Sequence, residues 1–237
     1  MQQIIIGSLL SVRNNIELIL LFFSGSVIIK YLQVRVWNSS SVFLILSITL
    51  YIYLLTATLR ALCDYEENGL WKWYDYIRGG IFYFPVIAVW ILFVFAVSKI
   101  INIAVNKFGS SFILSYAGML FLIGVIFFTA FIPAAKIAGR SLKQSAEFQA
   151  RLIRNNLLQL LTAGIYVFIL VQLMMMGTYM LMENAFRLKG TVAAIFMAAA
   201  GELIRSATVV VILSTFVKIV YDQSIKKDTN NIEKQEP

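Results

Sequence analysis

The sequence has 237 residues, of which 60% are hydrophobic, and its mean hydropathy is +0.82. Soluble domains are about 45–50% apolar, so this composition excludes an ordinary soluble globule and indicates a bilayer environment. The formal net charge is +8, and the chain contains one cysteine and no histidine. An intrachain disulfide is therefore excluded, as is any site that uses histidine as a base or ligand.

Six apolar segments are each long enough to cross about 30 Å of hydrocarbon, which takes about 20 helical residues. None shows the short alternating pattern of membrane β-strands. We therefore expect residues 1–222 to form an all-α membrane domain of six transmembrane helices, and the polar segment 223–237 to be a disordered cytosolic tail. The expected spans are Ile16–Gln33, Ser41–Leu59, Gly80–Ile103, Ser111–Ile132, Leu157–Met182 and Thr191–Val220.

An arginine followed by two amide or glycine residues stands at the start of the first, third and fifth segments. These motifs are Arg13-Asn14-Asn15, Arg78-Gly79-Gly80 and Arg154-Asn155-Asn156. The recurrence predicts three repeated helical hairpins, each preceded by an interfacial amphipathic segment, with the boundary arginines anchoring helix ends to phosphates. Because Asn and Gly tolerate turn geometry, each pair is expected to end the preceding helix and redirect the chain.

Basic residues set the expected orientation in the membrane. More of them lie at the segment ends that carry the boundary arginines than at the opposite ends, which hold Lys30, Arg35, Lys99, Lys107, Arg187 and Lys189. The arginine-rich ends, and with an even number of spans both termini, are therefore predicted to be cytosolic. Since the positive charge follows membrane boundaries, nucleic acid is not an expected partner.

Aromatic residues crowd the connection before the third segment, where Trp71, Trp73, Tyr74 and Tyr76 indicate a belt at headgroup depth. A clearer amphipathic pattern lies between the fourth and fifth segments. Its charged residues are spaced three or four apart, which places them on one face if the helix is continuous. They are Lys136, Arg140, Lys143, Glu147, Arg151 and Arg154. The five basic residues are expected to contact anionic headgroups, or alternatively a partner protein.

Glu202 and Arg205 are the only opposite charges well inside an apolar segment. Their spacing of three puts both on one helix face. Intramembrane charges are costly and favour an ion or substrate contact, and the alternative is a self-neutralising pair that faces the bundle. Lys30, at the end of the first segment, is expected to snorkel to the interface. The last segment is long enough to be kinked or broken at Gly201, as transporter helices often are.

One stretch carries a family resemblance. Ala138-Gly139-Arg140-Ser141-Leu142 with Ser145-Ala146, followed by Arg154–Leu158, resembles the interhelical segment of the YciC-like group and of the related membrane domain found beside some glycerophosphodiester phosphodiesterases. Leu213–Thr215 and Ile219–Tyr221, before a basic tail, are similar to the ends of those proteins, whereas the acidic Asp64–Gly69 departs from their pattern. The resemblance implies a six-helix protein of a prokaryotic inner membrane, and such families carry no settled activity.

Two functions stay open on this sequence. No phosphate loop, paired-histidine motif or CxxC is present, so a non-enzymatic protein without a cofactor or metal is expected. The first hypothesis is a scaffold or accessory subunit of a membrane complex, with other membrane subunits or a second copy as partners. The second is a small transporter or channel for an ion or lipid-like solute that uses Glu202 and Arg205. The scarcity of polar residues inside the spans favours the first.

Overall fold

The protein is all-helical in the part of the chain that the computed structural model describes, which is residues 2–36, 41–107, 112–187 and 192–232. Five of these helices are long and apolar enough to cross a membrane, or up to six if α1 and α2 form one bent span. The predicted class of helical membrane protein is therefore confirmed. The helices are α1 Gln2–Asn14, α2 Ile16–Val36, α3 Ser41–Asn68, α4 Trp73–Lys107, α5 Phe112–Thr129, α6 Phe131–Ile137, α7 Leu142–Arg187 and α8 Val192–Ile232.

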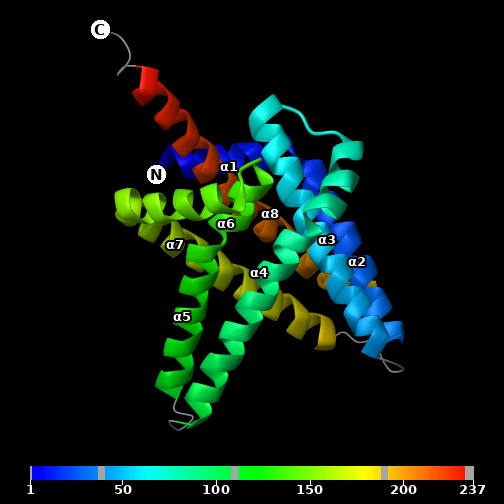
Figure 1. Ribbon diagram of the computed structural model, residues 1–237. Coiled ribbons are helices and arrows are strands. Elements are labelled where there is room, and N and C mark those ends of the chain that lie inside the picture. The colour runs from blue at the N-terminus through cyan, green and yellow to red at the C-terminus, as the bar shows by residue number, and fades with distance from the viewer. Residues whose placement is uncertain (1, 37–40, 108–111, 188–191, 233–237) are drawn as a thin grey trace.

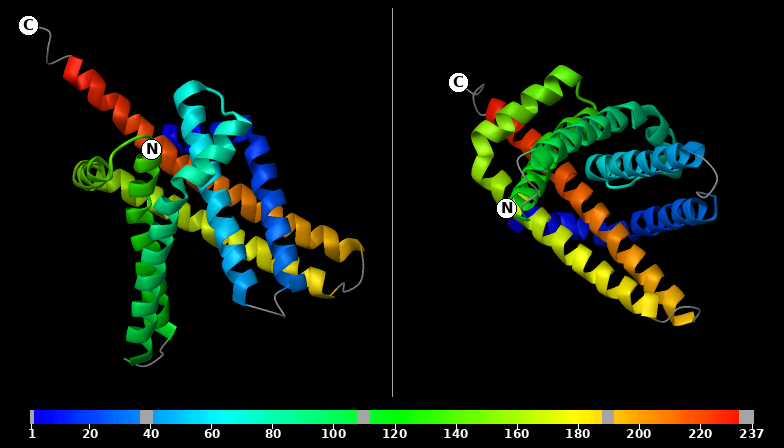
Figure 2. Two further views of the ribbon diagram at one scale, coloured as in Figure 1. Left: turned by 45° about the vertical axis from the view of Figure 1, so that its right-hand side comes forward. Right: turned by 90° about the horizontal axis from the view of Figure 1, so that it is seen from below.

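The long helices form three neighbouring pairs, α2–α3, α4–α5 and α7–α8 (Figure 1). The ends at which each pair is joined lie on the same side of the molecule, whereas α1, α6 and the first part of α7 lie on the other (Figure 2). The start of α1 and the end of α8 also lie on that second side (Figure 1). The pairs are placed unequally, since α7 and α8 run obliquely and α4–α5 projects beside them (Figure 2). The predicted threefold repeat therefore stays a prediction.

Each predicted apolar segment falls on a helix, and the helices are mostly longer than the segments. The first residues of two segments, Ser111 and Thr191, lie outside the described residues. The fourth segment is divided between α5 and α6 at Ala130. Pro133 accounts for the division, because it has no N–H to bond to the carbonyl of Thr129 and its ring crowds that carbonyl.

The last helix differs from the sequence analysis in two respects. The last segment is long enough to be kinked or broken at Gly201, but α8 is continuous through this position. The helix also continues to Ile232, so residues 223–232 of the expected disordered tail are helical. Extending an existing helix avoids the nucleation step, which is the costly part of helix formation. Residues 233–237 lie outside the described part of the chain.

Gly79 and Gly80 do not end a helix, contrary to the prediction, because α4 runs through them from Trp73. They lie instead where α4 meets α3. A Cβ on Gly80 would stand 2.5 Å from Tyr53 Cε2, so only glycine permits this approach. Small residues allow membrane helices to pack closely, and the absence of competing water keeps the backbone hydrogen bonds of glycine intact.

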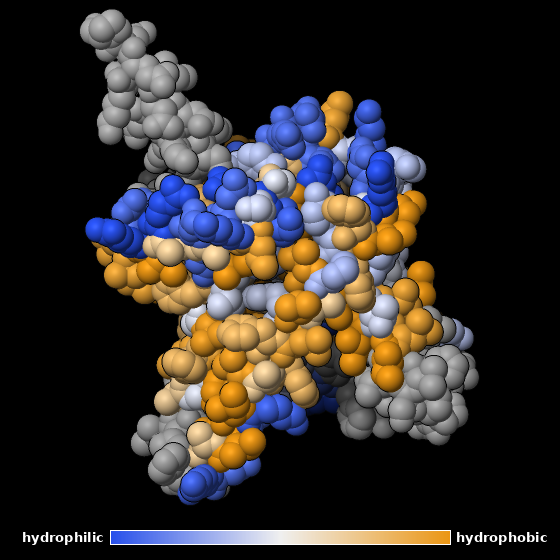
Figure 3. Space-filling view, in the orientation of Figure 1, coloured by the Kyte–Doolittle hydropathy of each residue, from blue (hydrophilic) through white to orange (hydrophobic). Residues whose placement is uncertain are grey.

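The main core lies where α3, α6, α7 and α8 meet. Leu62, Phe131 and Val217 are fully buried there, and the rings of Phe131 and Phe216 meet edge to face at 5.1 Å. The helix α4 contributes much less, since only 11% of its most apolar window is buried, against 44% for α3. Hydrophobic residues cover the middle of the molecule, with hydrophilic residues gathered above them (Figure 3). Much of α4 is therefore free to contact lipid or another protein.

Candidate functional site

Glu202 and Arg205 lie on the same side of α8, as their spacing predicts. Arg205 donates hydrogen bonds to Glu202 Oε1 from Nε at 3.0 Å and from Nη2 at 2.5 Å. The Glu202 side chain is only 5% exposed, whereas that of Arg205 is 29% exposed. The carboxylate is therefore enclosed by protein, and the guanidinium reaches partly out of the bundle.

Helix α2 supplies two further partners that the sequence analysis did not assign to this site. Ser26 Oγ donates to Glu202 Oε1 at 2.5 Å and accepts from Arg205 Nη2 at 2.6 Å. Lys30 Nζ pairs with the other carboxylate oxygen, Oε2. Lys30 was expected to snorkel to the interface, but its ammonium turns toward Glu202 while the side chain stays 51% exposed. A carboxylate from another helix offers a stronger contact than the solvated interface.

A third helix contributes Tyr51, whose ring lies 5.6 Å from the guanidinium carbon of Arg205. Tyr51 meets Phe22 edge to face at 5.8 Å, and Phe22 packs with Val12 and Val210 in a small buried cluster. The charge cluster, defined here as Ser26, Lys30, Tyr51, Glu202 and Arg205, thus joins α2, α3 and α8 next to an apolar layer. Its two cations and one anion leave an excess of one positive charge.

The chemistry available to this cluster is limited. Both carboxylate oxygens of Glu202 already accept hydrogen bonds from the protein. Within the residues that the structure describes, no group of three or more acidic or cysteine side chains is arranged to hold a metal ion. The contacts resemble a tie between helices more than a vacant binding site.

Two more ion pairs join helices or helix ends near the main core. Arg60 pairs with Asp64 at 2.6 Å and donates from Nη1 to the carbonyl oxygen of Ile137 at 2.8 Å, which connects α3 to α6. Lys218 pairs with Glu66 at 2.7 Å and connects α8 to α3. Sequence reasoning missed these contacts because the partners lie on different helices, although the position of Arg60 and Lys218 in or beside apolar segments was a usable signal.

The predicted basic stripe is divided between two helices. Helix α6 ends at Ile137, Gly139 has φ +92°, and α7 begins at Leu142. Lys136 and Arg140 therefore do not share a helix with Lys143, Arg151 and Arg154, and the expectation of one continuous face is wrong. A left-handed glycine ends one helix, and a reciprocal pair of hydrogen bonds between Ser141 and Gln144 begins the next.

Within α7 the basic residues still lie on one exposed side. Lys143, Arg151 and Arg154 are exposed, whereas Phe148 and Leu152 are buried in the main core. The stripe is visible as hydrophilic surface along the first part of α7 (Figure 3). Arg140 lies over the Phe148 ring at 4.1 Å, and its side chain is half-buried. What this exposed side binds stays a prediction.

The boundary arginines Arg13, Arg78 and Arg154 are all exposed. Two of the three expected chain breaks are found. The chain bends by 73° between α1 and α2 at Asn15, whose Nδ2 donates to the carbonyl oxygen of Ser11 at 2.7 Å. Helix α7 is kinked at Asn156, where φ is −134° and ψ is 29°. The role of these arginines as anchors at the membrane boundary stays a prediction.

No family model matches this chain, and no curated protein or solved structure is significantly similar to it. The resemblance to the YciC-like group therefore stays a prediction.

Proposed function

We propose that this protein is a non-enzymatic membrane scaffold, an accessory subunit that holds other membrane proteins and contacts anionic lipid on its cytosolic side. The observation that carries the proposal is that the charge of Glu202 is engaged by side chains of the same chain. Glu202 is fully engaged by Ser26, Lys30 and Arg205, so the charge joins helices of this chain and leaves no vacant ligand position.

The uneven burial of the helices supports the proposal that a second membrane protein binds this chain. The most apolar windows of α4 and α7 are only 11% and 17% buried within the chain, whereas those of α3 and α8 are each 44% buried. Helix α4 therefore presents most of its surface outward. We assign this surface to contact with lipid and a second membrane protein, and the side carrying Lys143, Arg151 and Arg154 to the anionic cytosolic leaflet.

A small transporter or channel is the second candidate, and one observation favours it. The charge cluster holds an excess positive charge, and Lys30 is 51% exposed, so an anion has access to it. The continuity of α8 counts against this candidate, because transporters commonly bind their substrates at broken helices.

Purification of the tagged chain in a mild detergent, followed by native mass spectrometry, tests the proposal. A stoichiometric protein partner is the expected result. A bare chain or a homo-oligomer that retains lipid would overturn the accessory role. Solute flux into liposomes would then be measured for Glu202→Gln, with Glu183→Gln as the matched control, because Glu183 forms an exposed ion pair with Arg187 outside the charge cluster. Loss of flux only in Glu202→Gln would establish transport.

A further inference from the structure

We propose that a groove between α3 and the start of α4 binds a glycerophospholipid, with its phosphodiester between Arg60 and Arg78 and an acyl chain along the adjoining side of α4. This inference rests on the proposed lipid-contacting scaffold and names a specific lipid site that lies away from the basic side of α7.

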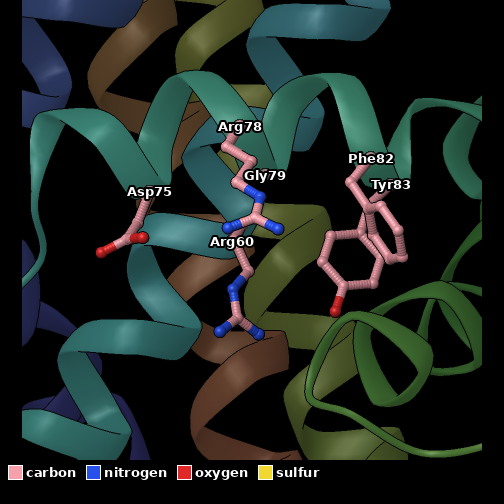
Figure 4. A pocket seen from close by; sticks show the side chains of 6 residues that line it. All are labelled: Arg60, Asp75, Arg78, Gly79, Phe82 and Tyr83. Atoms are coloured by element: carbon pink, nitrogen blue, oxygen red, sulfur yellow. The ribbon is translucent and has the colours of Figure 1, made fainter.

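The groove has a volume of about 240 Å³ and is lined by Arg60, Asp75, Arg78, Gly79, Phe82 and Tyr83. Figure 4 shows the Arg78 side chain directed toward the stem of Arg60, whose guanidinium extends further in the same direction, and the Tyr83 hydroxyl lies on the side of the Arg60 guanidinium. Both arginines line the groove, so an anion seated in it is attracted by two positive charges. A phosphate oxygen pair matches the fork of an arginine, and the hydroxyl of Tyr83 adds a third donor.

The two arginines differ in what the protein already provides for them. Arg60 is held by Asp64 and by the carbonyl oxygen of Ile137. Arg78 makes no hydrogen bond or ion pair within the described part of the chain, and its side chain is exposed. Arg78 is therefore the free cation of the groove, and Arg60 is a fixed one.

Gly79 explains how Arg60 reaches this position. A Cβ on Gly79 would stand 2.5 Å from Arg60 Cγ and 3.0 Å from Arg60 Cβ. The stem of Arg60 thus crosses directly over Gly79, which brings Arg60 to the groove that Arg78 also lines. The groove depends on this close contact between α3 and α4.

A second, almost wholly apolar groove of about 340 Å³ continues from the first. It is lined by Tyr74, Ile77, Arg78, Ile81 and Phe82, so Arg78 and Phe82 belong to both grooves. Ile81 and Phe82 are 67% and 71% exposed, which suits a surface covered by hydrocarbon. A free phosphate ion would use only the first groove, whereas a phospholipid fills both. The continuity of the two grooves therefore favours lipid.

Asp75 indicates which headgroup fits. Its carboxylate lies on the far side of Arg78 from Tyr83 (Figure 4). A headgroup that ends in a hydroxyl or a primary ammonium can donate a hydrogen bond to this carboxylate, whereas choline has no such donor. Phosphatidylglycerol and phosphatidylethanolamine are therefore expected to bind more tightly than phosphatidylcholine.

The test is native mass spectrometry of the full chain after exchange into nanodiscs of each of these three lipids. The wild type is expected to retain one phosphatidylglycerol or phosphatidylethanolamine per chain, and Arg78→Gln to lower that retention about tenfold, the effect of losing one charge-assisted bidentate contact. Lys72→Gln is the matched control, because Lys72 is an exposed cation close to Arg78 in sequence but outside both grooves.

A second variant, Ile81→Ser, distinguishes a lipid phosphate from a free phosphate ion. It is expected to weaken the retention of lipid and to leave the binding of inorganic phosphate unchanged. Binding of inorganic phosphate that depends on Arg78, without lipid retention, would overturn the lipid assignment. Equal lipid retention in Arg78→Gln and the wild type, or equal loss in Lys72→Gln, would overturn the site itself.

Folding and the proposed scaffold role are monitored in the same samples. Cys63 is 1% exposed, so its protection from a thiol reagent reports an intact core. If Arg78→Gln fails to fold, Tyr83→Phe removes only the hydroxyl and is expected to lower lipid retention about threefold, the effect of one neutral hydrogen bond; unchanged retention would count against the site. Loss of lipid with the protein partner still bound separates this site from the scaffold role.

Discussion

The charge cluster provides the sharpest test of how this fold is held together. In the Glu202→Gln variant the side chain keeps its shape but loses its charge, so Lys30 and Arg205 no longer have a counterion. Leaving a buried charge unpaired costs about 3–5 kcal/mol. Arg205 and Lys30 are 29% and 51% exposed, so both cations reach the interface in part and the cost falls. We expect a loss of about 2–3 kcal/mol in the free energy of unfolding, between that figure and the average of about 0.6 kcal/mol for a hydrogen bond between membrane helices.

The measurement is reversible unfolding in mixed micelles, followed by the reaction of Cys63 with a thiol reagent. Glu183→Gln is the matched control. It removes the Glu183–Arg187 pair, whose side chains are 43% and 70% exposed, and such pairs contribute about 0.3–0.5 kcal/mol. A loss in Glu202→Gln no larger than in this control would refute the structural role of the charge cluster.

A double variant tests the pairing itself. Removing Arg205 together with Glu202 eliminates one of the orphaned cations, so the double variant is expected to lose at least about 1 kcal/mol less than the sum of the single variants. Strictly additive losses would mean that the two side chains do not interact in the membrane.

The remaining predictions concern close packing, a helix bend and an enclosed thiol. Gly80→Ala is expected to cost about 1–3 kcal/mol of unfolding free energy, because its Cβ would meet the Tyr53 ring at 2.5 Å. A Cβ on Gly124 would meet nothing within 4 Å, so Gly124→Ala is expected to be neutral or stabilising in the same unfolding assay. An equal loss of stability in both variants would contradict the packing argument. Asn15→Ala removes a buried hydrogen bond at the α1–α2 bend and is expected to cost about 1–2 kcal/mol, again by unfolding. Cys63 in the native protein is expected to react with a maleimide at least about a hundredfold more slowly than in the unfolded chain, as a site protected by global stability requires; rapid native labelling would disprove the enclosed core around it.

The local parts of the fold follow from composition and from short-range chemistry. Apolar segments of bilayer length can only be helices, since every backbone group must bond within the segment. The bends at Asn15 and Asn156 are local as well, because an amide side chain competes for nearby backbone groups. The same reasoning failed at Gly79 and Gly80, where the two glycines serve a neighbouring helix and the backbone stays helical.

The candidate site was only half visible in the sequence. The spacing of Glu202 and Arg205 identifies an intrahelical pair, but Ser26 and Lys30 precede it by more than 170 residues, with separations of 176 and 172 from Glu202. Neither segment of the sequence predicts that α2 and α8 are neighbours. The basic stripe failed for a different reason. Its spacing assumed one helix, and Gly139 interrupts that helix by a single left-handed residue.

The contact between α2 and α8 also has a consequence for the order in which the helices are synthesised and inserted into the membrane. Lys30 enters the membrane with the first helices, and its carboxylate arrives only with the last, 172 residues later. Ser8 likewise waits for Ser214, which donates to its carbonyl oxygen at 3.3 Å. Until α8 is inserted, Lys30 lacks this carboxylate and the contact between Ser8 and Ser214 cannot form. A chain that stops short of α8 is thus left with a cation in α2 that lacks its counterion.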